Sequence, residues 1–144
     1  MHELWNDAVR AVQEGDIDQA RAAVAAGLST ENDDGVTLLH WAAYNNRVEI
    51  ASLLIDNGAN IDAQGGSLNE SPLMWAMRRK FYALAALLVE KGASLDLQSK
   101  TGYSVVHNTV RMNSDESAFG DVDGLFLLLE WGANPDCVDK NGDT

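Results

Sequence analysis

Several residue types that common functional sites require are scarce in this sequence of 144 residues. Cys137 is the only cysteine, so neither a disulfide framework nor a cysteine zinc site can form within one chain, and a reducing compartment fits best. Lys and Arg number 10 against 22 Asp and Glu, and the net charge of −12 argues against nucleic acid as a partner, because phosphate binding needs a basic surface. No stretch approaches the ~20 apolar residues of a membrane span, and the first residues do not form a signal-peptide pattern. We therefore expect a cytosolic segment without direct membrane contact.

Catalytic motifs are missing as well. The sequence has no Walker phosphate loop, no G-x-S-x-G elbow and no H-E-x-x-H pair. Cys137 has no neighbouring cation or histidine in the sequence that would activate it as a nucleophile. His40 and His107 occupy equivalent places in a repeated pattern, where we expect them to bond to the turn of their own repeat. The chain is therefore predicted to hold no catalytic residue, metal or cofactor.

The charged residues are unevenly distributed along the chain. Acidic residues gather at positions 31–34, 115–116, 121–123 and 136–143, which we interpret as solvated loops. Arg78-Arg79-Lys80 is the only basic cluster. The ordinary interpretation of this cluster is a solvated helix end, and a contact for an acidic peptide is the alternative.

Self-similarity is the dominant pattern of the sequence, in which hydrophobic residues make up 46%. Apolar helical runs are followed by related turns at Ala26-Gly27-Leu28, Gly58-Ala59-Asn60, Gly92-Ala93-Ser94 and Gly132-Ala133-Asn134. Upstream, Thr37-Leu38-Leu39-His40 recurs as Ser71-Pro72-Leu73-Met74 and as Ser104-Val105-Val106-His107, at spacings of 34 and 33 residues. This pattern resembles the ankyrin repeat, which has a T-P-L-H-x-A motif and two helices in about 33 residues.

Capping chemistry agrees with this resemblance. Thr37, Ser71 and Ser104 are good N-cap residues for the first helix of each repeat. Asn46 and Asn113 fall where the first helix ends, aligned with Gly15, and a left-handed residue is wanted there. Lys80 takes that place in the middle repeat, which departs from the pattern. The second helices carry apolar faces that must be buried on neighbouring repeats: Ile50/Leu53/Leu54, Leu84/Leu87/Leu88 and Leu125/Leu128/Leu129.

We therefore predict an all-α ankyrin-repeat solenoid, in which helix pairs alternate with β-turn or hairpin loops. A degenerate first repeat covers 1–32, fuller repeats cover 33–65 and 66–98, a repeat with a loop insertion at 113–123 covers 99–138, and 139–144 begins a truncated repeat. The insertion lengthens the interval from Gly92 to Gly132 to 40 residues, against 34 from Gly58 to Gly92. Because the chain stops where another first helix should start, we expect it to be a fragment of a longer protein.

Two stretches carry a closer resemblance. One is Val36-Thr37-Leu38-Leu39-His40-Trp41-Ala42-Ala43 with Asn45-Asn46-Arg47, and the other is Gly65-Gly66-x-Leu68-Asn69-x-x-Pro72-Leu73-x-Trp75-Ala76-x-Arg78. Together they resemble the N-terminal ankyrin region of the huntingtin-interacting type of DHHC palmitoyltransferases. The resemblance implies a substrate-recruiting module on the cytosolic side of an enzyme anchored in the Golgi or other endomembranes. Acyl transfer itself would belong to a DHHC domain outside this non-catalytic chain.

The resemblance also implies a binding pair for short unstructured segments of the aliphatic-aliphatic-x-x-Gln-Pro kind. In that family an Asn ends one first helix and a Trp lies thirty residues later, in the first helix of the next repeat, which Asn45 and Trp75 match. A Trp face can hold a proline ring, and an Asn amide can both donate to and accept from a peptide. The candidate peptide-binding residues are Asn45, Trp75, Trp41, Tyr44, Arg78 and Asn108.

Alternatives to this site remain open in the sequence. Trp41 and Trp75 share one column of the repeat and could simply pack between helices. Met74 replaces the usual histidine in the repeat that carries Trp75. An ankyrin adaptor that binds a folded protein partner through a broad surface is the alternative function. For either function we expect a monomer.

Overall fold

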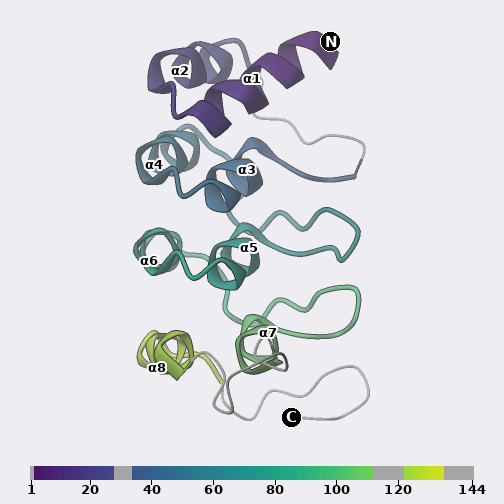
Figure 1. The fold of residues 1–144 in the computed structure, drawn as a ribbon, viewed down its shortest axis with the longest axis vertical. Coiled ribbons are helices and arrows are strands. Elements are labelled where there is room, and N and C mark those ends of the chain that lie inside the picture. The colour runs from purple at the N-terminus through teal and green to yellow at the C-terminus, as the bar shows by residue number, and fades with distance from the viewer. Residues whose placement is uncertain (1, 28–33, 112–121, 135–144) are drawn as a thin grey trace.

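The computed structural model describes residues 2–27, 34–111 and 122–134, and these residues form a stack of helix pairs (Figure 1). The first helices lie above one another in one column, the second helices form a parallel column, and the described loops between pairs extend to one side (Figure 1). The helices of the described residues are α1 (His2–Glu14), α2 (Ile17–Ala25), α3 (Leu38–Tyr44), α4 (Val48–Asp56), α5 (Pro72–Arg78), α6 (Tyr82–Glu90), α7 (Val105–Arg111) and α8 (Val122–Glu130). None of them is long and apolar enough to cross a lipid bilayer. The all-α repeat fold is thereby confirmed, whereas the exact repeat boundaries stay a prediction.

The first helices of the two central pairs begin as their capping residues predict. The Thr37 hydroxyl accepts a hydrogen bond from the His40 backbone N–H at 3.3 Å, and the Ser71 hydroxyl accepts one from the Met74 N–H at 3.3 Å. Pro72 follows as the first residue of α5, where a missing N–H leaves no intrahelical bond unmade. These contacts fix where α3 and α5 start, and therefore which side chains face each other across the two helices.

The turn from the first to the second helix of a pair uses a left-handed residue. Gly15, Asn46 and Lys80 have φ angles of 79°, 55° and 62°. Asn is a common substitute for Gly in this conformation, but Lys is not, so the repeat geometry overrides local preference at Lys80. Asn113, the corresponding residue predicted in the last pair, lies outside the described residues.

The second helices bury most of the apolar face that the sequence predicts. Leu54, Leu84, Leu88 and Leu128 are at most 1% exposed. The prediction is wrong for Leu129, which is 41% exposed on α8. The other predicted members of this face are buried in the case of Ile50 and half-buried in the case of Leu53, Leu87 and Leu125.

His40 joins two consecutive repeats through a fully buried imidazole. Its Nδ1 accepts from the Thr37 backbone N–H at 3.0 Å, and its Nε2 lies 2.8 Å from the Glu70 carbonyl oxygen. A carbonyl can only accept, so Nε2 carries the proton and the ring is neutral. Burial lowers the pKa of His40, and the hydrogen bond to Glu70 opposes that shift in part. The expected bond from histidine to its own turn is confirmed, with a further bond to the next repeat.

The double glycine Gly65-Gly66 lets two successive loops lie against each other. A Cβ added to Gly65 would lie 2.3 Å from both the carbonyl carbon and the oxygen of Gly35, so no side chain fits there. Gly66 has a φ of 80° and donates its N–H to the Asp34 carbonyl at 2.9 Å. The loop before α3 and the loop before α5 are therefore held in direct backbone contact.

We expect the free energy of unfolding to fall when the pH drops below about 6.5, because His40 is neutral in the folded chain. Its folded pKa lies below its unfolded value, so the unfolded chain takes up the proton first as the pH decreases. The His40 contribution is complete above the unfolded pKa and is lost progressively as the pH falls toward the folded pKa. Urea unfolding at about pH 7.5 and about pH 5.5 measures this loss, at most about 1.4 kcal/mol per pH unit. His40→Gln, which keeps a donor and an acceptor, should lose less stability over the same interval, and an equal loss in both proteins would contradict the assignment.

Gly65→Ala should lower the free energy of unfolding by about 1–3 kcal/mol, because the new methyl group meets the Gly35 backbone. Ser67→Ala is a suitable control, since Ser67 is exposed in the same loop and should change stability by less than about 0.5 kcal/mol. Chemical denaturation of the three proteins gives the comparison. Equal stabilities for the parent and Gly65→Ala would show that the loops can separate at no cost.

Candidate functional site

An aromatic cluster forms where α3 and α5 pack against each other. Trp41 and Tyr44 lie three residues apart on α3, and Trp75 reaches them from α5. The ring centroids are 6.1 Å apart for Trp41 and Tyr44, 6.2 Å for Trp41 and Trp75, and 6.0 Å for Tyr44 and Trp75. All three pairs meet edge to face, the geometry that the ring quadrupoles favour. The structure thus brings together the three aromatic residues that the sequence predicts at the site.

Trp75 is the fixed centre of this cluster. Its ring lies edge to face against the buried His40 imidazole, with centroids 4.9 Å apart. A Cβ added to Gly66 would lie 3.3 Å from Cζ2 of Trp75, so the double-glycine turn also runs close to the indole. Trp75 is half-buried. The histidine and the turn therefore hold one part of the ring while another part reaches the surface.

A surface cavity of about 510 Å³ opens beside this ring. The described residues that line it are Tyr44, Trp75, Arg78, Arg79 and Phe81. Aromatic rings and guanidinium groups together suit a ligand that has an apolar part next to a polar or anionic part. The volume is within the range of small-ligand pockets, and one or two side chains of a peptide would fill it.

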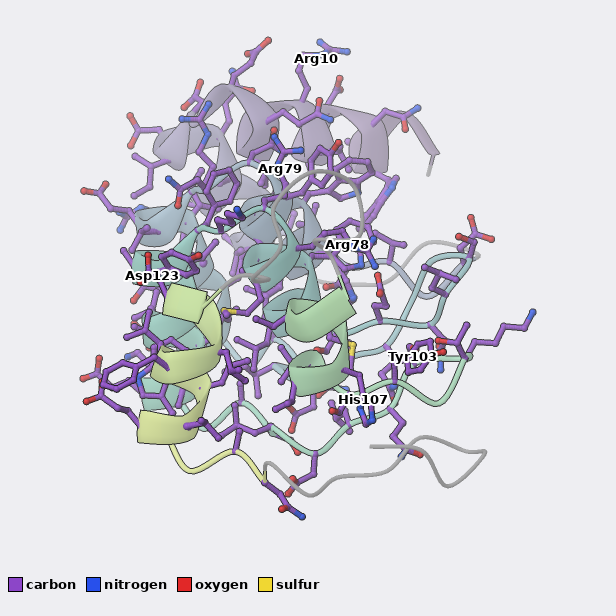
Figure 2. The ribbon with its side chains drawn as sticks, turned by 60° about the horizontal axis from the view of Figure 1, so that its bottom comes forward. Arg10, Arg78, Arg79, Tyr103, His107 and Asp123 are labelled. Carbon is purple, nitrogen blue, oxygen red and sulfur yellow. The ribbon has the colours of Figure 1, made fainter. Side chains whose placement is uncertain are left out.

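The two arginines of this cavity, which are labelled in Figure 2, have different partners. Arg78 forms an ion pair with Glu70, whose side chain is 3% exposed, while the Arg78 side chain is 40% exposed. Arg79 places its guanidinium carbon 4.3 Å from the centroid of Tyr44 and 5.4 Å from that of Phe81. Arg78 therefore neutralises a buried carboxylate, and Arg79 covers an aromatic wall of the cavity.

Trp41 contacts the other two rings of the cluster but does not line the cavity. It is half-buried, and its ring does not belong to the described lining of the cavity. Its indole Nε1 is buried, and no described residue accepts a hydrogen bond from it. Trp41 therefore acts mainly on the position of Tyr44 and Trp75, through the edge contacts that it makes with both.

Asn45 ends α3 next to Tyr44. Its side-chain Nδ2 donates to the Trp41 carbonyl at 2.8 Å and so adds a second hydrogen bond to a carbonyl that already accepts from the Asn45 backbone N–H. Asn45 is half-buried and is not among the described residues that line the cavity. The side chain of Asn108, the remaining candidate, lies outside the described residues.

Sequence reasoning did not include Arg79 and Phe81 among the candidate site residues, although it gave the basic cluster that contains Arg79 a contact for an acidic peptide as its alternative interpretation. The repeat alignment held a signal for Arg79, because it occupies in its repeat the column that Asn45 occupies in the previous one. Phe81 directly precedes α6, in a position where no motif marks it. Its place in the cavity depends on the turn through Lys80, which the sequence pattern did not favour.

Comparisons with known proteins agree with this architecture. The family model for ankyrin repeats in three copies matches residues 8–101. Putative palmitoyltransferase ZDHHC13 of Danio rerio is 36% identical over 140 residues, covering 96% of this chain and 21% of that protein. Palmitoyltransferase ZDHHC17 of Homo sapiens is 44% identical over 77 residues, covering 52% of this chain and 12% of that protein. Palmitoyltransferase Hip14 of Drosophila melanogaster is 47% identical over 72 residues, covering 49% of this chain and 11% of that protein.

These similarities confirm the predicted resemblance to ankyrin repeats and to palmitoyltransferases. This chain spans about a fifth or less of the length of the three relatives. The matched region is a repeat array, and such arrays use their surfaces to bind proteins. A protein-interaction module is therefore the function class that the matched family indicates.

Arg78→Gln should lower the free energy of unfolding by about 1–3 kcal/mol, because the buried Glu70 carboxylate loses its guanidinium partner. Adding Glu70→Gln should recover part of the loss, since a neutral amide costs less to bury than a carboxylate. Urea unfolding of the single and double variants measures both effects.

Lys91→Gln is the control for this comparison. It removes the ion pair of Lys91 with Asp56, whose side chains are 35% and 57% exposed, and should cost less than about 1 kcal/mol. If Arg78→Gln costs no more than Lys91→Gln, the pair with Glu70 does not stabilise the fold.

Proposed function

This chain belongs to the ankyrin-repeat family, and from that premise we propose that it is a substrate-recruiting module of a larger protein S-acyltransferase. In this proposal it docks short unstructured segments of the aliphatic-aliphatic-x-x-Gln-Pro type. The observation that carries the proposal is the cavity to which α3 contributes Tyr44 and α5 contributes Trp75, with Asn45 following Tyr44 directly at the end of α3. The chain itself contributes binding, and acyl transfer to a substrate cysteine belongs to another part of the parent protein.

The chemistry of Trp75 suits a proline-containing peptide. An indole gives a large apolar surface with little loss of side-chain entropy on binding. His40 and the turn at Gly66 both lie close to the indole, so little reorganisation is needed when a peptide arrives. A preorganised ring converts more of its contact area into affinity than a mobile one would.

Asn45 can add a polar contact to the same peptide. One amide hydrogen of Asn45 bonds to the Trp41 carbonyl, and an amide has a second hydrogen and an oxygen with two lone pairs. The capping bond also fixes the rotamer of the side chain. An extended backbone or a glutamine side chain offers both the acceptor and the donor that such an amide can pair with.

Recruitment gives a binding module an effect on a reaction that it does not catalyse. Docking a substrate segment raises the local concentration of its cysteine near a linked enzyme, so affinity for the segment can be modest. We infer a parent protein anchored in the Golgi or another endomembrane, with this monomeric domain facing the cytosol. A disordered segment pays ordering entropy, and micromolar affinity, about −8 kcal/mol, is the expected range.

A fluorescent peptide containing Val-Val-x-x-Gln-Pro should bind the parent domain, and Trp75→Ala should weaken binding by at least about 2 kcal/mol. Asn45→Ala should weaken it by about 1 kcal/mol through the lost amide contacts. Fluorescence anisotropy measures the affinities, and thermal melts show whether each variant is folded. Trp75→Phe keeps a ring against His40 and serves where Trp75→Ala does not fold.

Asn57→Ala is the matched control for Asn45→Ala. Asn57 follows α4 and donates its Nδ2 to the Leu53 carbonyl at 2.7 Å, the same capping contact that Asn45 makes to Trp41. Both variants should lose similar stability, but only Asn45→Ala should lose peptide affinity. Equal affinity in all folded variants, or no binding by the parent, would favour an adaptor that contacts a folded partner over a broad surface.

A further inference from the structure

We propose that Arg79 binds an acidic side chain of the docked peptide, an Asp or Glu that flanks the motif held by Trp75. The inference rests on the proposed function, because it names an additional subsite of the same cavity. It assigns peptide selectivity to a residue outside the Asn45 and Trp75 pair. The ligand group is a single carboxylate carried by a peptide.

Charge distribution is the first observation that supports this subsite. The chain has a net charge of −12, and yet the lining of its cavity contains two guanidinium groups among the described residues. Acidic groups predominate elsewhere, so a basic lining is a local exception that the bulk composition does not explain. A carboxylate on a ligand would meet its complementary charge at this cavity and repulsion over much of the remaining surface.

The pairing of the two arginines identifies Arg79 as the residue that remains for a ligand. Arg78 pairs with the buried Glu70 carboxylate, and breaking this ion pair would leave an unpaired charge in an apolar environment. In the described part of the chain, Arg79 forms no ion pair with a carboxylate, and its guanidinium lies over the rings of Tyr44 and Phe81. A carboxylate from a peptide would therefore not displace a described internal partner.

Stacking on two aromatic rings also positions the Arg79 guanidinium to bind a carboxylate. A guanidinium that lies over an aromatic ring uses its flat face for that contact and keeps its N–H donors at its edge. Two aromatic neighbours restrict its rotamers, so less entropy is lost when a carboxylate binds in a fork-to-fork arrangement. Arg79 is exposed, so water and salt screen an ion pair at this position and its contribution to affinity should be modest.

The neighbouring lysine offers a matched control for this assignment. Lys80 directly follows Arg79, carries the same charge and is exposed, but it is not among the described residues that line the cavity. Lys80→Gln and Arg79→Gln therefore lower the local charge equally. Only the second variant removes a guanidinium from the cavity.

The experiment compares three Val-Val-x-x-Gln-Pro peptides that differ only at their flanks. One has Asn immediately before and after the motif, one has Asp before it, and one has Asp after it. Each is titrated against the parent domain, Arg79→Gln and Lys80→Gln, with Trp75→Phe as the test of the main anchor and thermal melts as the test of folding. We expect one Asp peptide to bind the parent about threefold to tenfold more tightly than the Asn peptide. Arg79→Gln should abolish that preference, Lys80→Gln should retain it, and added salt should reduce it.

Each other outcome overturns the inference in a recognisable way. If all peptides bind the parent equally and Trp75→Phe weakens them all, the peptide groove stands and the acidic subsite does not exist. If the preference survives in Arg79→Gln, or is lost equally in Lys80→Gln, the carboxylate does not bind at Arg79. If the parent binds none of the peptides, the proposed function fails and the subsite fails with it.

Discussion

The neutral imidazole of His40 is the contact on which the candidate site depends. It bonds to Thr37 at the start of its own helix and to the Glu70 carbonyl of the next repeat. Its ring also packs edge to face with the ring of Trp75. Fixing the Glu70 backbone also fixes the carboxylate that pairs with Arg78. One buried side chain therefore sets the spacing of two repeats, the position of the aromatic anchor and the pairing of one basic residue. These three effects follow from a ring that is both uncharged and hydrogen-bonded at both nitrogens.

Local chemistry was enough to predict where the helices begin and turn. Thr37 and Ser71 cap their helices, and Asn46 has the left-handed conformation expected of it, because these features depend on residues only three or four positions away. The contact between the loops at Gly35 and Gly65 was not predictable in this way. It joins residues thirty positions apart, and their register is set by the stacking of whole repeats.

Some contacts of the candidate site were predictable from the sequence and others were not, for the same reason. The aromatic cluster was predictable because Trp41 and Trp75 recur at one repeat position, and neighbouring first helices must place such residues together. The different partners of Arg78 and Arg79 were not, since adjacent residues at a helix end look alike in sequence. Their separation results from the burial of Glu70 on one side and the exposure of Tyr44 on the other.

Met74 makes the interface between its repeat and the following repeat different from the interface one repeat earlier. It is 1% exposed at the position that His40 holds one repeat earlier, and a thioether cannot donate the hydrogen bond by which His40 reaches the following loop. The stability of a repeat array is close to a sum of repeat and interface terms, so the interface between α5 and α7 lacks a contribution that the interface between α3 and α5 has. Cooperativity should then be lower at that junction than between α3 and α5. Separating the last pair of helices from the array should cost less free energy than separating the helices that build the aromatic cavity.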